Sequence, residues 1–383
     1  MKNYEVIIIG CGASGSMCAL NTKCKSLAII DSQTKIAKKI LVTGNGRCNL
    51  TNINLQNKNY NEDISKFLNK FDVDKTLNFF TSLGLETYAD EEGRVYPISN
   101  SAKSVVDVLS NKIEDSADLF LGQTVEDIEK KEDCFVVKTE NETFICKKLV
   151  ICSGGKSLTK ALKTLGVKIK EFYPSLVALK SKEIKDLNGV KVSNVLVTAT
   201  NSVGESKGEL GEVLFKDGGL SGIVIFNLST LFSRVQSYSG KITIDLLPNL
   251  TEEELINKLE KRKNLNICLD KFFTGMFVPA LSNEILKQAK INTNLNSLKL
   301  NINQIKILAK TIKGLTYNID GCFDNNQVFS GGVELISLTD TLMHKDIKNL
   351  YFAGEICNVD GVCGGFNLQW AWTSGHIVGD SLW

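Results

Sequence analysis

This 383-residue sequence has very few histidines and almost no net charge. The only two histidines, His344 and His376, have no spacing that indicates a metal site or a catalytic nucleophile. Lysine and arginine number 45 and aspartate and glutamate 43, so the formal net charge is +2. A charge this small excludes a strong global field for nucleic acid or an anionic membrane, although a local basic groove is compatible with it.

Paired cysteines and long apolar runs are also absent. The eleven cysteines are an odd, scattered set without a C-x-x-C pair, which disfavours zinc and dithiol chemistry. No apolar run approaches the about 20 residues of a spanning helix. Met1 leads almost directly into the apolar residues 6–9, which leaves no room for a signal peptide. We therefore expect a cytoplasmic protein with mostly buried, reduced thiols, no metal and no membrane segment.

The composition is that of a globular protein, with 43% hydrophobic and 23% charged residues. The length exceeds what one core usually supports, so two domains, or one domain with a large insertion, are expected.

A β-α-β unit of about thirty residues begins the chain. A buried strand over residues 4–9 is followed by Gly10-Cys11-Gly12-Ala13-Ser14-Gly15, a helix from Ser14 and a second strand over residues 26–30. In such a G-x-G-x-x-G turn, Gly10 allows the tight turn, Gly12 admits a pyrophosphate and Gly15 lets helix and strand pack closely. Backbone amides at the helix start, with Ala13 and Ser14, would then face the phosphates.

Asp31 follows the second strand, with Ser32 beside it, about twenty residues after Gly10. A carboxylate at this spacing is expected to accept hydrogen bonds from ribose hydroxyls, although a solvated turn aspartate would look the same. Because an acid there disfavours a 2′-phosphate, the pattern favours FAD or NAD over NADP.

Further along, the pattern changes from mixed to strand-rich and then to helical. Residues 104–113 have helical spacing, residues 118–151 alternate as strands, and residues 179–247 read as a small β domain. Thr251 and Glu254 match a capping box before a mainly helical stretch to residue 310. We expect an α/β fold: residues 1–178 and 314–383 form a Rossmann-like FAD-binding domain, and residues 179–313 an inserted β-barrel-like and helical substrate domain.

Two more glycine clusters, at Gly154-Gly155 and at Gly354-Glu355, each follow an apolar strand, and a simple NAD dehydrogenase needs neither. Together with the long strings at residues 40–52, 93–97, 219–222, 330–333 and 354–375, they make the chain resemble a two-dinucleotide-binding-domain flavoprotein. It is similar in particular to the BaiN/YhiN-type family, also described as aminoacetone oxidase family FAD-binding enzymes. Two departures are Asp31, where such proteins often carry Glu, and Cys363 in the last glycine turn.

The resemblance implies FAD and a set of contacts along nearly the whole chain. No histidine or cysteine stands in an obvious attachment motif, which favours a noncovalent flavin. Residues 44–49 would form a flexible loop over the pyrophosphate and flavin, with Arg47 supplying positive charge, and Glu355 would bind the ribityl chain. The start of the last helix would stabilise negative charge on the reduced flavin. The implied contacts beyond the fingerprint and Asp31 are Asn45, Gly46, Arg47, Cys48, Val125 at the adenine, Ser153, Gly154, Gly354, Glu355, Gly365, Asn367 and Leu368. Trp370 and Trp372 are interpreted as core residues, and His376 as a packed histidine.

The sequence does not identify the molecule that reduces the flavin. No second G-x-G-x-x-G occurs between Gly155 and Gly314, so NAD(P)H would have to dock transiently, or a substrate would reduce the flavin. Residues 44–49 hold only Cys48, which disfavours dithiol exchange, while a redox role for Cys357 and Cys363 stays open. If a general acid is needed, Tyr96, Arg94 or a substrate-domain residue could serve, and the sequence does not choose among them.

Two functions remain as hypotheses. The first is an FAD-dependent oxidoreductase of a small organic molecule; the resemblance covers both amine oxidation and reduction of unsaturated steroid-like substrates. The second is an FAD-containing RNA-modifying or RNA-binding protein, weakly supported by Lys258, Lys261, Arg262 and Lys263. Nucleic acid is the less favoured partner, and the sequence does not define the oligomeric state.

Overall fold

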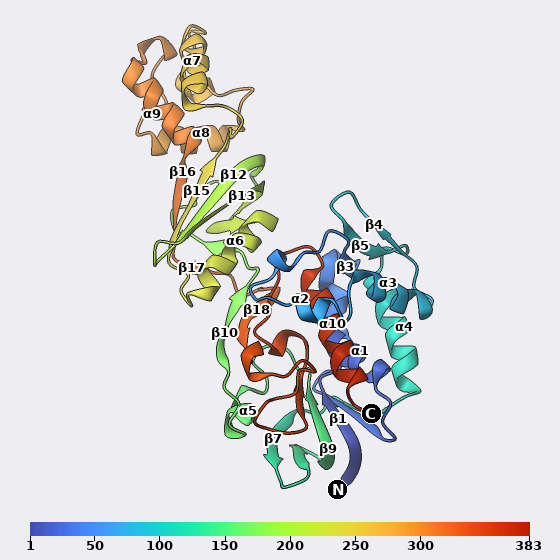
Figure 1. The fold of residues 1–383 in the computed structure, drawn as a ribbon. Helices are drawn as coiled ribbons and strands as arrows, with labels where there is room; N and C mark the ends of the chain where they lie inside the picture. Colours follow the sequence, from blue (N-terminus) through green and yellow to red (C-terminus); the bar gives the residue numbers. More distant parts are fainter. The chain divides into compact units, whose positions relative to one another are not determined.

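The computed structural model describes all 383 residues, Met1–Trp383, and consists of two compact units (Figure 1). Unit 1 comprises Met1–Phe172 and Val328–Trp383, and unit 2 comprises Tyr173–Gln327. The boundaries expected at 178/179 and 313/314 therefore need correction. Strand β16 (Leu315–Ile319) pairs with β15 (Gly240–Asp245), so its backbone hydrogen bonds place the segment after residue 314 in unit 2.

Unit 1 is built on a seven-stranded sheet in the order β6-β2-β1-β9-β8-β7, with β19 also paired to β9. Its parallel strands are β6 (Asp118–Leu121), β2 (Leu27–Asp31), β1 (Lys2–Ile9), β9 (Thr143–Ile151) and β19 (Leu350–Phe352). Antiparallel β8 (Phe135–Thr139) and β7 (Val125–Lys130) complete it. The apolar run 6–9 at the end of β1 is buried, as expected for a parallel strand covered on both faces.

The remaining elements of unit 1 surround this sheet. The helices are α1 (Ala13–Asn21), α2 (Ser65–Leu68), α3 (Val73–Ser82), α4 (Ala102–Glu114), α5 (Thr159–Thr164) and α10 (Phe366–Asp380). A small antiparallel sheet is formed by β3 (Thr51–Asn52), β5 (Arg94–Pro97) and β4 (Thr87–Ala89). Strands β10 (Lys170–Ser175) and β18 (Val328–Gly332) pair with each other where the chain passes between the units.

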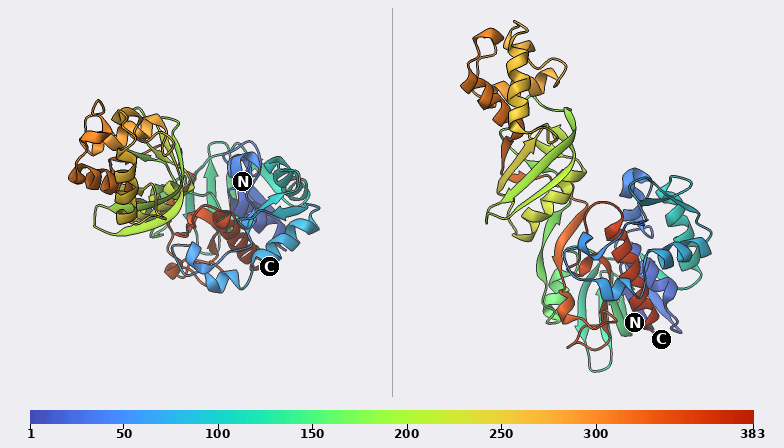
Figure 2. Two further views of the ribbon diagram at one scale, coloured as in Figure 1. Left: turned by 90° about the horizontal axis from the view of Figure 1, so that it is seen from above. Right: turned by 45° about the horizontal axis from the view of Figure 1, so that its top comes forward.

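Helix α10, the last element of the chain, lies directly against α1, the first helix (Figures 1 and 2). A Cβ added at Gly375 would lie 2.4 Å from the carbonyl oxygen of Ser14, and one added at Gly379 would lie 2.6 Å from that of Cys18. Any larger side chain at these two positions would therefore push the helices apart.

The two tryptophans of α10 are core residues, as expected: Trp370 is 1% exposed and Trp372 0%. Their indole nitrogens donate to the Gly354 and Leu50 carbonyl oxygens, at 3.1 and 2.9 Å. Because a buried indole N–H needs an acceptor, these bonds attach α10 to the turn after β19 and to the chain before β3.

Unit 2 contains a seven-stranded sheet in the order β16-β15-β12-β13-β14-β11-β17, and its neighbouring strands are antiparallel. The other strands are β11 (Leu179–Lys180), β12 (Lys191–Asn201), β13 (Ser206–Lys216), β14 (Gly219–Ser221) and β17 (Gly321–Cys322). The end strands β16 and β17 are joined by the single residue Asp320. Two residue steps, from Ile319 to Gly321, span at most about 7 Å, so the sheet curls until its edges meet there, like a barrel.

Helix α6 (Ile223–Arg234) packs on β12 and β13, although residues 179–247 were expected to be strand-like. Its first turn is rich in β-branched and aromatic residues, which favour strands in isolation. Burial of Ile225, Leu228 and Phe232 against the sheet overrides that preference.

The rest of unit 2 is helical, as expected, with α7 (Glu252–Lys263), α8 (Pro279–Gln288) and α9 (Ile302–Lys313). The capping box at the start of α7 is confirmed. Thr251 Oγ1 accepts from the Glu254 amide at 3.2 Å, and Glu254 Oε2 accepts from the Thr251 amide at 2.8 Å.

None of the helices combines the length and the apolar character that crossing a bilayer requires.

Removing the α7 cap should weaken unit 2. Thr251→Ala leaves the Glu254 amide without its acceptor, so we expect a loss of about 1 kcal/mol, whereas Thr251→Ser keeps the oxygen and should change the stability little. Denaturant unfolding followed by circular dichroism measures both. Equal midpoints for the alanine and serine variants would contradict the capping interaction.

Candidate functional site

The candidate site lies at the edge of the unit 1 sheet where its parallel strands end. The chain leaves β1 at Gly10, β2 at Asp31, β9 at Cys152 and β19 at Ala353. Gly10 N donates to Ile30 O at 2.8 Å, Cys152 N to Ile9 O at 2.7 Å, and Ala353 N to Ile151 O at 3.0 Å. Neighbouring turns are thus joined across the sheet, and parallel α/β sheets bind ligands at this edge.

The glycine turn between β1 and α1 has the geometry that its spacing indicated. Gly10 has φ of +99°, and a Cβ there would lie 2.6 Å from Cys152 O. A Cβ at Gly15 would lie 1.9 Å from Gly10 O, whereas one at Gly12 would meet no protein atom within 4 Å. The turn is therefore packed at its first and third glycines and open at the second.

The N-terminus of α1 carries neither a side-chain cap nor an acidic residue in its first turn. The first intrahelical bond runs from Ser16 N to Gly12 O at 2.9 Å, so the amides of Ala13, Ser14 and Gly15 precede the helical bonding pattern. Uncapped amides at the positive end of a helix form a site for a phosphate.

Asp31 fastens the glycine turn to the second strand. Its Oδ2 accepts from Cys11 N at 2.6 Å and its Oδ1 from Gln33 N at 2.7 Å, which leaves each oxygen a lone pair for a sugar hydroxyl. Gln123 N donates to the Asp31 carbonyl oxygen at 2.9 Å, and Val125, 8% exposed, follows two residues later. The structure thus brings Asp31, expected to bind the ribose, close to Val125, expected at the adenine. Ser32 is exposed beside Asp31.

The turns after β9 and β19 also meet. A Cβ added at Gly154 would lie 3.1 Å from Glu355 Oε2, and one at Gly354 would lie 2.4 Å from Ser14 Oγ. The buried Ser153 hydroxyl has no hydrogen-bond partner in the protein, so the junction contains an unused donor.

Glu355 is held by two groups that the sequence did not reveal. Its Oε2 pairs with Lys39 Nζ at 2.9 Å, and its Oε1 accepts from Phe329 N at 2.9 Å. Lys39 is more than 300 positions away in the chain, so no local pattern connects the two residues.

Helix α10 contacts the turn after β19 through Trp370 and Ser374. Its N-cap, Gly365, has φ of +96°, and neither a side-chain cap nor an acid neutralises the first turn. The Gly354 amide donates to Ser374 Oγ at 2.9 Å, which attaches this helix to the turn after β19.

Asn367, in the first turn of α10, was expected to contact FAD, but its side chain bonds to the protein itself. Asn367 Nδ2 donates to Gly361 O at 2.8 Å, and its Oδ1 accepts from Gly361 N at 2.9 Å. Leu368 is half-buried. The side chain of Asn367 therefore orders the preceding glycine turn, while the backbone amides of the first turn remain uncapped.

The segment expected to be a flexible loop, residues 44–49, overlaps the end of a kinked 3₁₀ helix, η1 (Lys38–Gly46), whose residues Thr43, Gly44 and Asn45 have non-helical backbone angles. Asn45 and Cys48 have φ of +56° and +59°. Arg47 lies with its guanidinium carbon 4.4 Å from the centre of the Tyr96 ring, so its shown contact is with an aromatic face. A Cβ at Gly46 would meet only Leu41 O, at 3.9 Å.

Six of the nine cysteines of unit 1 are buried, and both histidines pack against aromatic rings. All eleven thiols are free, and burial raises the pKa of Cys48 to about 12 and that of Cys357 well above its ordinary value. His376 stacks on Phe71 with ring centres 4.1 Å apart, and burial lowers its pKa. The interpretation of His376 as a packed residue is confirmed. No group of three or more His, Cys, Asp or Glu side chains is arranged to hold a metal ion.

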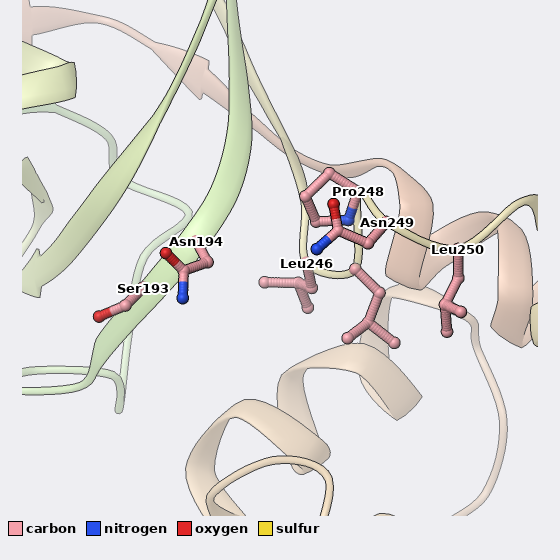
Figure 3. A pocket seen from close by; sticks show the side chains of 7 residues that line it. Ser193, Asn194, Leu246, Pro248, Asn249 and Leu250 are labelled. Carbon is pink, nitrogen blue, oxygen red and sulfur yellow. The ribbon is translucent and has the colours of Figure 1, made fainter.

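A separate cavity of about 180 Å³ lies in unit 2, between β12 and the connection from β15 to α7 (Figure 3). Ser193, Asn194 and residues 246–250 line it. It is smaller than typical ligand pockets of about 300–1,000 Å³, so it does not compete with the sheet edge as a dinucleotide site.

Cys48 should resist thiol reagents in the folded protein. A thiol with a pKa near 12 that is also buried offers little thiolate. An aromatic disulfide reagent at mildly alkaline pH should therefore leave Cys48 unmodified and react first among the half-buried thiols, which are Cys24, Cys134, Cys268, Cys322 and Cys363. Peptide mass mapping identifies the sites, and all eleven thiols should react after unfolding. Rapid modification of native Cys48 would contradict its burial.

Comparison of the whole chain with known proteins identifies a family to which it is similar. The family described as HI0933-like protein Rossmann domain matches residues 4–381. The chain is 31% identical to a 3-dehydro-bile acid delta(4,6)-reductase of Clostridium scindens, over 97% of each chain. It is 28% identical to a ribosomal RNA dihydrouridine synthase of Haemophilus influenzae, over 100% of this chain and 99% of that protein.

A solved structure resembles the whole chain at the level of the fold. The 3-ketosteroid delta1-dehydrogenase of Sterolibacterium denitrificans has a TM-score of 0.52 with 11% identity, over 100% of this chain and 99% of that one. The Rossmann-like α/β fold expected from the sequence is confirmed, as is the family that the sequence resemblance indicated. The chain belongs to the HI0933-like family of Rossmann-domain flavoprotein oxidoreductases.

Proposed function

We propose that this protein is an FAD-dependent reductase of carbon–carbon double bonds conjugated to a carbonyl group in a small organic molecule, with NAD(P)H as a transient reductant. The observation that carries the proposal is the pair of uncapped helix N-termini, of α1 and α10, on one closely packed framework. The name of the C. scindens relative, a delta(4,6)-reductase, supports the reaction class.

The residues at the sheet edge fit FAD in chemistry. A phosphate suits the open face of Gly12 and the free amides of α1, and Asp31 keeps lone pairs for a ribose. The unpaired Ser153 hydroxyl suits a polar ligand atom. The residues proposed to hold FAD are Gly10, Gly12, Ala13, Ser14, Gly15, Asp31, Ser32, Asn45, Gly46, Arg47, Cys48, Val125, Ser153, Gly154, Gly354, Glu355, Gly365, Asn367 and Leu368.

Bound FAD would supply hydride transfer, which no side chain can perform. The protein would contribute electrostatic stabilisation of the cofactor and would fix the groups that bind it. The positive end of α10 favours negative charge near Gly365, and the Lys39 pair holds the Glu355 carboxylate in place for a hydroxyl donor. Because a second fingerprint is absent from the sequence, nicotinamide is proposed to dock transiently.

Alanine substitutions in the glycine turn should separate folding from FAD binding. Gly12→Ala adds a methyl group that meets no protein atom, so the thermal midpoint of the FAD-free protein should stay near that of FAD-free wild type while FAD content falls. Gly15→Ala places a methyl against Gly10 O and should lower the midpoint itself. Flavin absorbance and thermal melting measure the two effects. A Gly12→Ala protein that retains full FAD content would contradict the assignment of the pyrophosphate.

The reaction is tested by anaerobic mixing. NADH or NADPH should bleach the oxidised flavin spectrum, and 2-cyclohexenone or a Δ4-3-ketosteroid should restore it with a product two hydrogens heavier. The saturated ketone is the control and should leave the flavin reduced. Protein that takes up no FAD, or reduced protein that no conjugated enone reoxidises, would contradict the proposal.

A second candidate substrate is a uracil base in RNA, which also carries a double bond conjugated to a carbonyl. It is favoured by the names of the H. influenzae relative and of one from Escherichia coli, 27% identical over the whole chain, both ribosomal RNA dihydrouridine synthases. Residues 251–313 of unit 2 contain eleven lysine and arginine residues but six acidic ones. Helix α9 contains no acid and exposes Lys306 and Lys310.

RNA binding through α9 has its own test. In the double variant Lys306→Gln with Lys310→Gln, the slope of log affinity for a ribosomal RNA fragment against log salt should fall by about 2. The exposed lysines of α5, Lys160 and Lys163, are the matched control pair. Equal slopes for both double variants, or no RNA binding by wild type, would contradict this candidate and leave the small-molecule substrate.

A further inference from the structure

Tyr96 occupies an unusual position beside the η1 segment. Its ring is buried, 3% exposed, beneath the Arg47 guanidinium, and a Cβ at Gly44 would lie 3.4 Å from its Cε1. Strand β5, which carries Tyr96, pairs with β3 through Val95 and Thr51. The ring is therefore fixed to the segment that is proposed to contact the flavin.

The same strand pair leads to the N-terminus of α10. A Cβ added at Gly365 would lie 2.6 Å from Thr51 O, and Thr51 Oγ1 donates to buried Gln369 at 2.6 Å. Tyr96 is one residue from Val95, which pairs with Thr51. A short series of contacts thus connects Tyr96 with the helix terminus proposed to face the reacting part of the cofactor.

The hydroxyl of Tyr96 differs from those of Tyr4, Tyr60 and Tyr88, although that of Tyr351 likewise has no hydrogen bond with the protein. The hydroxyls of Tyr4, Tyr60 and Tyr88 donate to Asp118, Phe366 O and Asn100 at 2.6–2.8 Å. That of Tyr96 makes no hydrogen bond with the protein and is not among the fully buried unpaired atoms, so it reaches the surface from a buried ring. It is the donor on this strand that is available to a ligand.

Arg94, the other candidate acid of β5, is unsuitable. Its Nε and Nη1 pair with Asp90 Oδ2 at 2.8 Å and Glu92 Oε2 at 2.9 Å. A guanidinium does not release a proton in proteins, and these two carboxylates stabilise its charged form. The cations Arg94 and Arg47 would instead stabilise a phenolate at Tyr96.

We propose that Tyr96 is the proton donor of the reduction, a step that rests on the proposed function. Bound, reduced FAD would supply the hydride, with its electron pair, for the β-carbon of the conjugated alkene. The α-carbon takes the Tyr96 hydroxyl proton, using the electron pair of the broken π bond. The phenolate of Tyr96, stabilised by Arg47, then regains a proton from water.

The electrostatic surroundings keep the donor protonated between turnovers. Burial raises the pKa of Tyr96, Arg94 and Arg47 lower it, and Asp90 and Tyr88 raise it, with a net increase. Because the protonated form persists throughout the neutral range, the acid form is available at physiological pH.

The test compares Tyr96→Phe with Tyr88→Phe, a neighbouring tyrosine whose ring centre is 6.0 Å away. FAD-loaded protein is reduced with dithionite and mixed anaerobically with 2-cyclohexenone or 1-nitrocyclohexene. The nitroalkene product leaves as a stable nitronate and needs no proton at carbon. We expect Tyr96→Phe to slow reoxidation by the enone by about 10²-fold or more and to leave the nitroalkene rate nearly unchanged. Tyr88→Phe should match wild type with both.

A measurement without turnover accompanies this one. In protein labelled with ¹³C at tyrosine Cζ, the resonance that Tyr96→Phe removes should shift when saturated cyclohexanone binds. An enone rate of Tyr96→Phe equal to wild type, an equal loss with both alkenes, or an unmoved resonance would overturn the role of Tyr96. Wild-type protein that neither alkene reoxidises would instead contradict the proposed function, and the proton-donor step with it.

Discussion

The close contact between backbone atoms around α1 is the constraint on which the rest of unit 1 depends. Gly15 lies against the Gly10 carbonyl, Gly375 against that of Ser14, and Gly379 against that of Cys18. No side chain fits in these three places, so the first strand, the first helix and the last helix form one rigid group. Two helix N-termini, more than 350 residues apart in sequence, are thereby held in one framework.

Local signals in the sequence predicted those parts of the fold that local interactions determine. The β-α-β unit, the capping box at Thr251 and the packed tryptophans followed from spacing and composition, and the structure agrees. Helix α6 was missed because its β-branched first turn favours a strand until the sheet of unit 2 covers it. Strand β16 was assigned to the wrong unit because strand pairing over a long separation has no local pattern.

In the candidate site too, the sequence predicted the features that depend on local spacing but not those that depend on tertiary contacts. The glycine turns and Asp31 were readable because each needs a particular residue at a fixed spacing. The pairing of Lys39 with Glu355 and the contact of Arg47 with Tyr96 depend on tertiary structure alone. The four-residue spacing of Gly375 and Gly379 was a usable signal for close helix packing. In this structure Arg47 lies against the Tyr96 ring, so the segment that is proposed to contact FAD also contacts the proposed proton donor.

The central claim is that both helix N-termini serve one FAD molecule. A crystal structure of the protein with FAD tests this most directly. The account predicts the pyrophosphate at the amides of Ala13 and Ser14, the adenosine ribose at Asp31, and the pyrimidine side of the flavin at the first-turn amides of α10, near Gly365. An FAD whose pyrophosphate lies away from Gly12, or a flavin ring that leaves the N-terminus of α10 in solvent, would contradict it.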